Sequence, residues 1–188
     1  MHCTDWRALI AQLPKRLRSL RPGARPQDIA TVERVLDQRL LGRRLPRQFR
    51  NFLYAADGGW LGDHRIYGTP ELLDLLRGVG AAPGTLWPRR RKLLPFHPVD
   101  RRGIECLDLG QPDAPVVWCR DRTLERRGQA NRPMADYELH GLARRIGVWA
   151  GRRKPEMHPT YPDFLDWALD VLCDLRSAVP GVQVAGRN

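Results

Sequence analysis

Residues 29–59, IATVERVLDQRLLGRRLPRQFRNFLYAADGG, carry the strongest structural signal in the chain. They predict two amphipathic helices joined at a Leu-Pro step, because apolar residues recur at helical spacing on both sides of Pro46. Pro46 suits the first turn of the second helix, where its missing N–H removes a donor that has no partner. Gly58 and Gly59 are expected to end that helix, since glycine adopts the left-handed backbone of a helix terminus. The apolar positions are Ile29, Val32, Leu36 and Leu40 in the first helix and Phe49, Phe52, Leu53 and Ala56 in the second.

Turn and capping signals divide the rest of the chain into further elements. A first helix is expected over residues 5–20, with Pro14 ending or kinking it. Thr69, Pro70 and Glu71 predict the start of a helix that runs to about Arg77. Thr160 and Asp163 resemble a capping pair for a last helix that runs to about Ser177. Strands are expected over residues 64–67, 93–97, 104–109 and 115–120. A hairpin turn is expected at 110–114, and the short connections favour antiparallel pairing. Residues 78–92 and 121–133 favour loops, and residues 137–151 fit either a broken helix or a strand.

Length and composition favour one folded domain. The chain has 188 residues, 42% of them hydrophobic, with six tryptophans and four phenylalanines, which is typical of a globular core. It contains no apolar run of the roughly 20 residues that span a bilayer. Its first residues, MHCTDWRALI, lack the long apolar region of a signal peptide. We therefore expect a cytoplasmic protein with no membrane contact.

Neither the cysteines nor the histidines have the spacing of a metal site. The four cysteines lie far apart and form no CxxC pair, so free and mostly buried thiols are expected in a reducing compartment. Structural zinc requires paired ligands at short spacing. We expect no metal and no cofactor. The cysteines are Cys3, Cys106, Cys119 and Cys173.

The chain is strongly basic, with a formal charge of +11. Only Lys15, Lys92 and Lys154 are lysines, and such an arginine skew can arise from genome base composition alone. The arginines occur in short clusters along the whole chain, with no single basic tail. Arginine pairs well with carboxylates and phosphates, so the charge predicts an acidic partner without fixing its chemistry.

The motifs of common enzyme classes are missing from the sequence. It contains no GxSxG, no GxxxxGK[ST] loop and no HExxH. Asp57 and the Asp63-His64 pair are candidates for acid–base chemistry, but acids commonly occupy such turns and loops. Asp108 is expected to face solvent or cap a turn, and the apolar neighbours of Cys106 and Cys119 indicate packing residues. We therefore expect a protein that is not an enzyme.

Aromatic residues near element ends are candidates for anchoring a partner. The same residues could instead complete the core, because large aromatic side chains tend to be buried. One local run, WPRRR at residues 87–91, places a tryptophan beside three arginines, as in surfaces that stack on single-stranded RNA. The candidate partner-binding residues are Trp60, Tyr67, Trp87, Arg89, Arg90, Arg91 and Trp118.

Several motifs, taken in order, resemble the SUKH superfamily, which includes the fungal Smi/Knr cell-wall regulators and many bacterial immunity proteins. The opening signature is Ile-x-x-Val-Glu ending at Glu33, then Leu45-Pro46, Phe-x-x-Phe-Leu and Asp-Gly-Gly. GIECLDL (residues 103–109) and APVVW (114–118) are similar to the central strands of the family. YPDFLDWAL (161–169) is similar to its closing helix, although Tyr-Pro-Asp replaces the usual small residue.

The resemblance implies a single SUKH-like domain over residues 1–188, with a core of about 5–177 and an insertion within 122–157. The implied fold is α+β: N-terminal helices packed on a mainly antiparallel sheet, closed by a C-terminal helix. The implied function is that of an immunity protein, which neutralises a bacterial toxin by direct binding.

The charge of the chain constrains that partner. Inhibitors of nucleases present acidic surfaces to basic clefts, whereas this chain is basic. The sequence therefore predicts either a toxin domain with an acidic surface or an acidic patch hidden within the basic average. The alternative function is a nucleic-acid-associated protein that binds through its arginine clusters.

Overall fold

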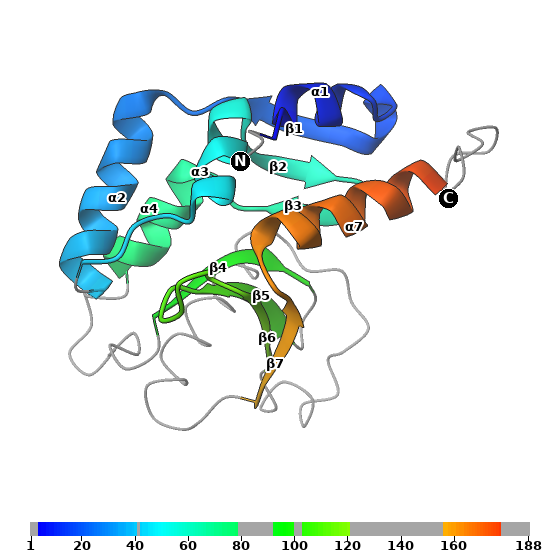
Figure 1. Ribbon diagram of the computed structural model, residues 1–188. Coiled ribbons are helices and arrows are strands. Elements are labelled where there is room, and N and C mark those ends of the chain that lie inside the picture. The colour runs from blue at the N-terminus through cyan, green and yellow to red at the C-terminus, as the bar shows by residue number, and fades with distance from the viewer. Residues whose placement is uncertain (1–3, 41, 79–91, 100–102, 121–155, 178–188) are drawn as a thin grey trace.

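The computed structural model describes residues 4–40, 42–78, 92–99, 103–120 and 156–177. The described chain is an α+β fold in which helices pack against antiparallel sheets (Figure 1). The helices are α1 (Trp6–Ala11), α2 (Pro26–Leu40), α3 (Arg47–Ala55), α4 (Thr69–Gly78) and α7 (Phe164–Ser177), with a short 3-10 helix η1 (Lys15–Leu17). The strands are β1 (Arg18–Pro22), β2 (Ala56–Leu61), β3 (His64–Ile66), β4 (Leu93–Pro98), β5 (Gly103–Asp108), β6 (Val116–Arg120) and β7 (Glu156–Tyr161).

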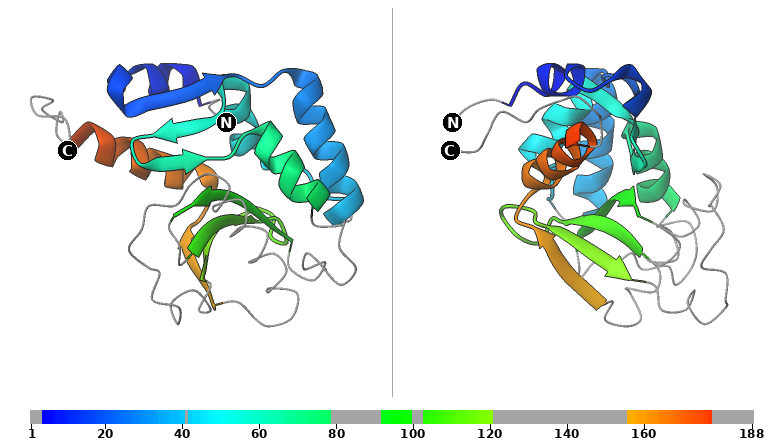
Figure 2. Two further views of the ribbon diagram at one scale, coloured as in Figure 1. Left: turned by 180° about the vertical axis from the view of Figure 1, so that it is seen from behind. Right: turned by 90° about the vertical axis from the view of Figure 1, so that its right-hand side faces the viewer.

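The strands form two antiparallel sheets. Sheet A has the order β1-β2-β3, and sheet B has the order β4-β5-β6-β7. The sheets meet where the backbone N–H of Tyr67 donates to the carbonyl of Phe96 at 2.8 Å. Helix α7 crosses one face of sheet A, and in the rear view β2 and β3 lie in front of it with no described helix over them (Figure 2). Sheet B lies below sheet A and α7 in the view of Figure 1.

An aromatic cluster joins the helices to the sheets. Phe49 of α3 packs on Phe164 of α7 with ring centroids 4.8 Å apart. Phe96 of β4 packs edge-on against Trp167 of α7 at 4.9 Å. Trp6 of α1 adds an edge contact of 5.7 Å to Phe52. All of these rings are buried, so α1, α3, α7 and β4 share one core.

Several predicted elements are confirmed. Helices α2 and α3 form on either side of Pro46, and the predicted apolar stripes are buried. Helix α4 begins at Thr69, and α7 ends at Ser177, as expected. The 110–114 turn joins the antiparallel strands β5 and β6. In that turn, the Asp108 carboxylate accepts hydrogen bonds from Gly110 and Gln111, which is the turn-capping role expected of it.

Other predictions were wrong. The first helix ends at Ala11, and the rest of residues 5–20 contributes η1 and part of β1. Gly58 and Gly59 do not end α3; they lie inside β2. The N-terminus of α7 is capped by Asp163 alone, whose carboxylate accepts from the Asp166 N–H at 2.9 Å. Thr160 belongs to β7, where its hydroxyl donates to the Val116 carbonyl.

Glycine occupies β2 because two neighbouring strands approach it closely. Gly58 has a φ of +72°, and a Cβ there would lie 2.4 Å from the N of Gly68 and 2.7 Å from the carbonyl O of Ile66. A Cβ on Gly59 would lie 2.4 Å from the carbonyl O of Ser19. The Gly-Gly pair therefore permits sheet A to form. The predicted insertion at 122–157 and the 137–151 segment lie outside the described residues, except that 156 and 157 begin β7.

Candidate functional site

The candidate partner-binding residues that the structure describes, Trp60, Tyr67 and Trp118, do not form one surface. Trp60 is 37% exposed on sheet A, and the guanidinium carbon of Arg65 lies 5.4 Å from the centre of its ring, a cation–π distance. The two residues are cross-strand partners on β2 and β3. Exposed tryptophan and arginine are typical of binding hot spots. Trp60 therefore remains a candidate contact residue, with Arg65 holding its ring.

Tyr67 and Trp118 lie away from Trp60. Tyr67 is fully buried at the junction of the two sheets, so it belongs to the core and not to an interaction surface. Trp118 is half-buried on sheet B, paired with Glu105 and His158 in the strand register. The WPRRR run, which contains Trp87, Arg89, Arg90 and Arg91, lies outside the described residues.

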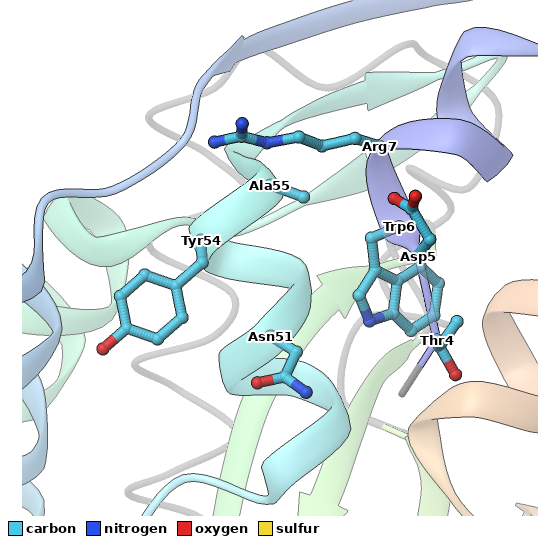
Figure 3. A pocket seen from close by; sticks show the side chains of 7 residues that line it. All are labelled: Thr4, Asp5, Trp6, Arg7, Asn51, Tyr54 and Ala55. Carbon is cyan, nitrogen blue, oxygen red and sulfur yellow. The ribbon is translucent and has the colours of Figure 1, made fainter. Parts of the chain in front are cut away.

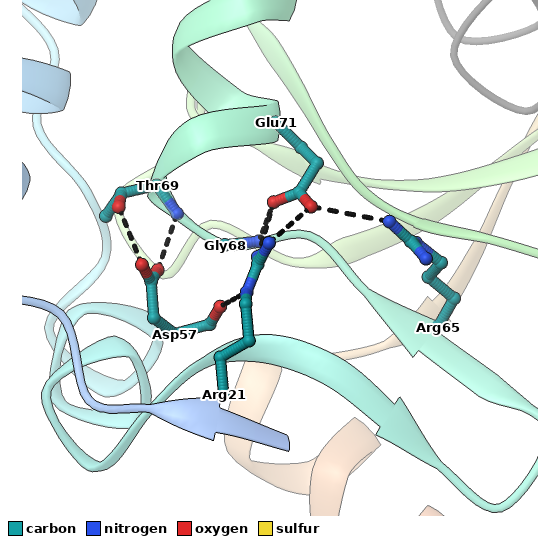
Figure 4. A network of polar contacts seen from close by, with 6 residues as sticks. All are labelled: Arg21, Asp57, Arg65, Gly68, Thr69 and Glu71. Carbon is teal, nitrogen blue, oxygen red and sulfur yellow. Dashed lines mark hydrogen bonds and ion pairs between the residues drawn. The ribbon is translucent and has the colours of Figure 1, made fainter. Parts of the chain in front are cut away.

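A network of charged groups fixes β1 to the start of α4 (Figure 4). Glu71 accepts two parallel hydrogen bonds from the Arg21 guanidinium, at 2.7 and 2.5 Å. It also accepts from Arg65 at 3.3 Å and from the Gly68 N–H at 3.0 Å. Burial alone would raise the pKa of Glu71, but the hydrogen bonds from Arg21 and Gly68 outweigh it, so this pKa lies below its ordinary value. The Arg65 that stacks on Trp60 is thus anchored by Glu71.

Asp57 belongs to the same structural network. Its carboxylate accepts from the Thr69 N–H at 2.6 Å and from the Thr69 hydroxyl at 2.8 Å. A carboxylate beside a hydroxyl could suggest a base and a nucleophile. However, Thr69 is only 3% exposed, and both contacts cap the N-terminus of α4. Asp57 therefore has a structural role, as expected, but it lies in strand β2 and caps α4, so its assignment to a turn was wrong.

The solvent face of α7 is acidic, and sequence reasoning missed it. Asp166, Asp170 and Asp174 recur every four residues and are all exposed, with Leu169 between them 37% exposed. From residue 163 to residue 177 the chain has four aspartates and one arginine. We call Asp166, Leu169, Asp170 and Asp174 the α7 acidic face. The signal was present in the sequence, because positions four apart share one side of a helix.

The opposite charge gathers between α2 and α3. Residues 39–50 contain five arginines and no acid. Within this segment Arg50 contacts Glu33 of α2 at 3.4 Å. Helix α2 lies at the left of Figure 1, whereas α7 extends to the right. The described part of the molecule therefore carries positive and negative surfaces on different elements.

Two histidines meet beneath α7. The rings of His64 (β3) and His97 (β4) lie 5.2 Å apart, and both contact Trp167 of α7, at 6.3 and 5.2 Å. His97 is 4% exposed, and its Nδ1 lies 2.9 Å from the Glu105 carboxylate. Of the Asp63-His64 pair, the half-buried His64 joins this cluster, whereas Asp63 is exposed in the β2–β3 turn. Among the described residues, no three histidine, cysteine or acidic side chains are arranged to hold a metal ion.

Cys106 and Cys119 are buried packing residues, as the sequence predicted. Burial raises the pKa of the Cys106 thiol well above its ordinary value, and its hydrogen bond with Cys119 raises it further. A thiol in this state is a poor nucleophile.

A hollow of about 450 Å³ lies between α1 and α3 (Figure 3). Its Asp5 carboxylate is engaged, because it accepts from the Ala8 N–H at 3.0 Å to cap α1. The Trp6 indole nitrogen is buried and has no acceptor within the described part of the chain. These groups offer a docking hollow and no paired nucleophile and base. The lining residues are Thr4, Asp5, Trp6, Arg7, Asn51, Tyr54 and Ala55.

Comparison with protein-family models, with curated proteins and with solved structures gave no match. None of the helices formed by the described residues is long and apolar enough to cross a bilayer.

Proposed function

We propose that this chain is a non-enzymatic, SUKH-type protein-binding domain that acts in the cytoplasm as an immunity protein, neutralising a bacterial toxin by direct contact. The observation that carries the proposal is the α7 acidic face. Three exposed aspartates flank an exposed leucine on the closing helix of a chain whose net charge is +11. An apolar residue within a charged rim is a common arrangement at protein interfaces.

The α7 acidic face favours one of the two partners that the sequence left open. A toxin that acts on nucleic acid presents a basic cleft, and an acidic helix can occupy it while steering fast association. The partner we propose is therefore a toxin domain with a basic surface, in place of one with an acidic surface. Trp60 and Arg65 form a second candidate contact on sheet A.

Co-expression with the product of an adjacent reading frame tests the proposal. The expected result is a stable complex that survives purification at moderate salt, together with loss of the product's toxicity. A product that stays toxic and separates from this chain at low salt contradicts the proposal.

One observation favours a second candidate, a nucleic-acid-associated protein. The five arginines of residues 39–50 form an acid-free basic segment, as in phosphate-binding surfaces. This candidate predicts RNA or DNA binding that falls steeply between about 50 and 200 mM salt. A protein complex with an apolar centre persists over that range, so a salt titration separates the two functions.

A further inference from the structure

His64, His97 and Trp167 form the joint between the two sheets and α7. His64 lies on β3 at the end of sheet A, and His97 lies on β4 at the edge of sheet B. Their rings contact each other at 5.2 Å, and both contact the Trp167 ring of α7. Trp167 is 2% exposed and packs on Phe96. A change in the charge of either histidine therefore affects Trp167, the residue through which α7 packs on the two sheets.

The Glu105 carboxylate fixes the orientation of His97. The His97 Nδ1 lies 2.9 Å from the Glu105 carboxylate, within hydrogen-bond distance. Both side chains are buried, and the contact joins β4 to β5. His64 is half-buried, whereas His97 is almost fully buried. His64 is therefore the member of the pair that protons reach more easily.

The groups around His64 oppose its protonation on balance. Burial and the neighbouring His97 lower the pKa of His64 below its ordinary value. Glu105 on β5, Asp63 in the β2–β3 turn and Asp174 on α7 act in the opposite direction but do not cancel the effect.

Tyr161 is a further titratable group that contacts α7. It donates its hydroxyl to Asp170 at 2.5 Å, and this bond, with burial, raises its pKa to about 12. It therefore stays neutral while histidine titrates.

We propose that the contact of His64 with His97 and Trp167 is a proton-operated latch: protonation of His64 loosens α7 from the two sheets and so releases a protein bound to the α7 acidic face. The loosening follows because a new positive charge arises beside a second imidazole and an apolar ring, where water is scarce. Release of a partner rests on the function proposed above. The loosening of α7 does not, since it is a property of the chain alone.

Asp174 connects the latch to the α7 acidic face. Its carboxylate is one of the groups that favour the charged form of His64. A basic partner bound at this face neutralises that carboxylate, so the bound state holds a proton on His64 less readily. Because linkage is reciprocal, acid must then weaken binding of the partner.

Hydrogen exchange on the free, full-length chain tests the latch. Rates are measured at pH 7.5 and 5.5 and corrected for the intrinsic effect of pH. We expect the opening of α7 to increase below pH 6.5, by at most about tenfold per pH unit for one proton, while α2 stays unchanged as an internal control. His64→Asn is expected to remove most of the increase, and His64→Gln to reproduce that result. Equal acceleration of α2 and α7, or full pH dependence in both variants, would overturn the latch.

A second measurement separates this inference from the proposed function. If an adjacent reading-frame product binds, its dissociation rate should rise several-fold from pH 7.5 to 5.5 for the natural chain and stay flat for His64→Asn. If the product fails to bind at either pH, the proposed function fails while the exchange result still stands. If it binds with a pH-independent rate, the function survives and release by the latch is refuted.

Discussion

Arg21 and Glu71 lie 50 residues apart and are joined by two parallel hydrogen bonds of 2.7 and 2.5 Å. This bidentate contact ties the edge strand β1 to the first turn of α4. The Arg21 Nε–H also donates to the carbonyl of Asp57 at 2.6 Å, so one side chain links β1, β2 and α4. Sheet A depends on this link, because β1 pairs with no described strand besides β2.

We predict that Glu71→Gln lowers the free energy of unfolding by about 2 kcal/mol. The figure lies below the usual cost of breaking a fully buried pair because the Arg21 side chain is 39% exposed. Urea unfolding at pH 7 measures the change. Arg25→Lys is the control, since Arg25 contacts Asp28 at the surface, and its midpoint should not move.

The same variant has a predicted pH signature. The folded-state pKa of Glu71 lies below its ordinary value, so its contribution to stability is complete above about pH 4.5 and is lost as pH falls through the folded-state pKa. Glu71→Gln should therefore differ less from the natural chain at pH 3 than at pH 7. A difference that grows in acid would contradict the assigned direction.

Gly58→Ala should be far more destabilising than Gly42→Ala. Both glycines have a positive φ, but a Cβ on Gly42 would meet only an Asp37 oxygen at 3.9 Å, whereas on Gly58 it would meet backbone at 2.4 Å. We expect a loss of about 1 kcal/mol at Gly42 from backbone strain and roughly 3 kcal/mol at Gly58, where overpacking adds to strain. Thermal or urea unfolding compares the two. Equal losses of unfolding free energy in the two variants would show that the close backbone approach at Gly58 does not constrain the residue there.

Thiol labelling should distinguish the exposed cysteine from the buried ones by their reaction rates. In a Cys3→Ser background, Cys173 is exposed and should react with a disulfide reagent within minutes at pH 8, whereas the buried Cys106 and Cys119 should react only on unfolding. The raised pKa of Cys106 adds to its protection. Rapid reaction of all three thiols in the folded chain would contradict the packing of sheet B.

Tyr161 should ionise later than an ordinary tyrosine. Its pKa is raised to about 12 by the bond to Asp170, so the stability it contributes is present below pH 10 and is lost as pH rises toward 12. Tyrosine ionisation is followed by ultraviolet absorbance in the natural chain and in Tyr161→Phe. The difference between the two titration curves should show one transition near pH 12. A difference transition near pH 10 would mean that the bond to Asp170 does not form.

Local sequence signals predicted the helices well and the strands of sheet A poorly. Helices α2, α3 and α7 carry their own apolar periodicity, so their prediction needed no knowledge of distant residues. Strand β1, RSLRP, has no alternation of apolar and polar residues, and it forms because β2 pairs with it. Gly58 and Gly59 were wrongly assigned to a helix end because their positive φ angles serve strand approach, a tertiary constraint.

The candidate site divides in the same way. The spacing of Asp166, Asp170 and Asp174 on a predicted helix contains the information needed to find the acidic stripe, although sequence reasoning did not use it. Exposure of Trp60 and burial of Tyr67 could not be predicted, because both lie near element ends and only the packing of the sheets separates them. The contact between His64 and His97 joins two sheets across 33 positions, and no local pattern marks it.

The central claim, that the α7 acidic face binds a basic toxin domain, is tested most directly by association kinetics with the product of the adjacent reading frame. Asp166→Asn with Asp174→Asn removes two charges from this face, and the exposed Asp37→Asn with Asp113→Asn removes two from elsewhere. We predict that the first pair slows association about tenfold at low salt and flattens its salt dependence, while the second pair changes neither. Equal effects of the two pairs, or no effect of the first, would contradict the claim.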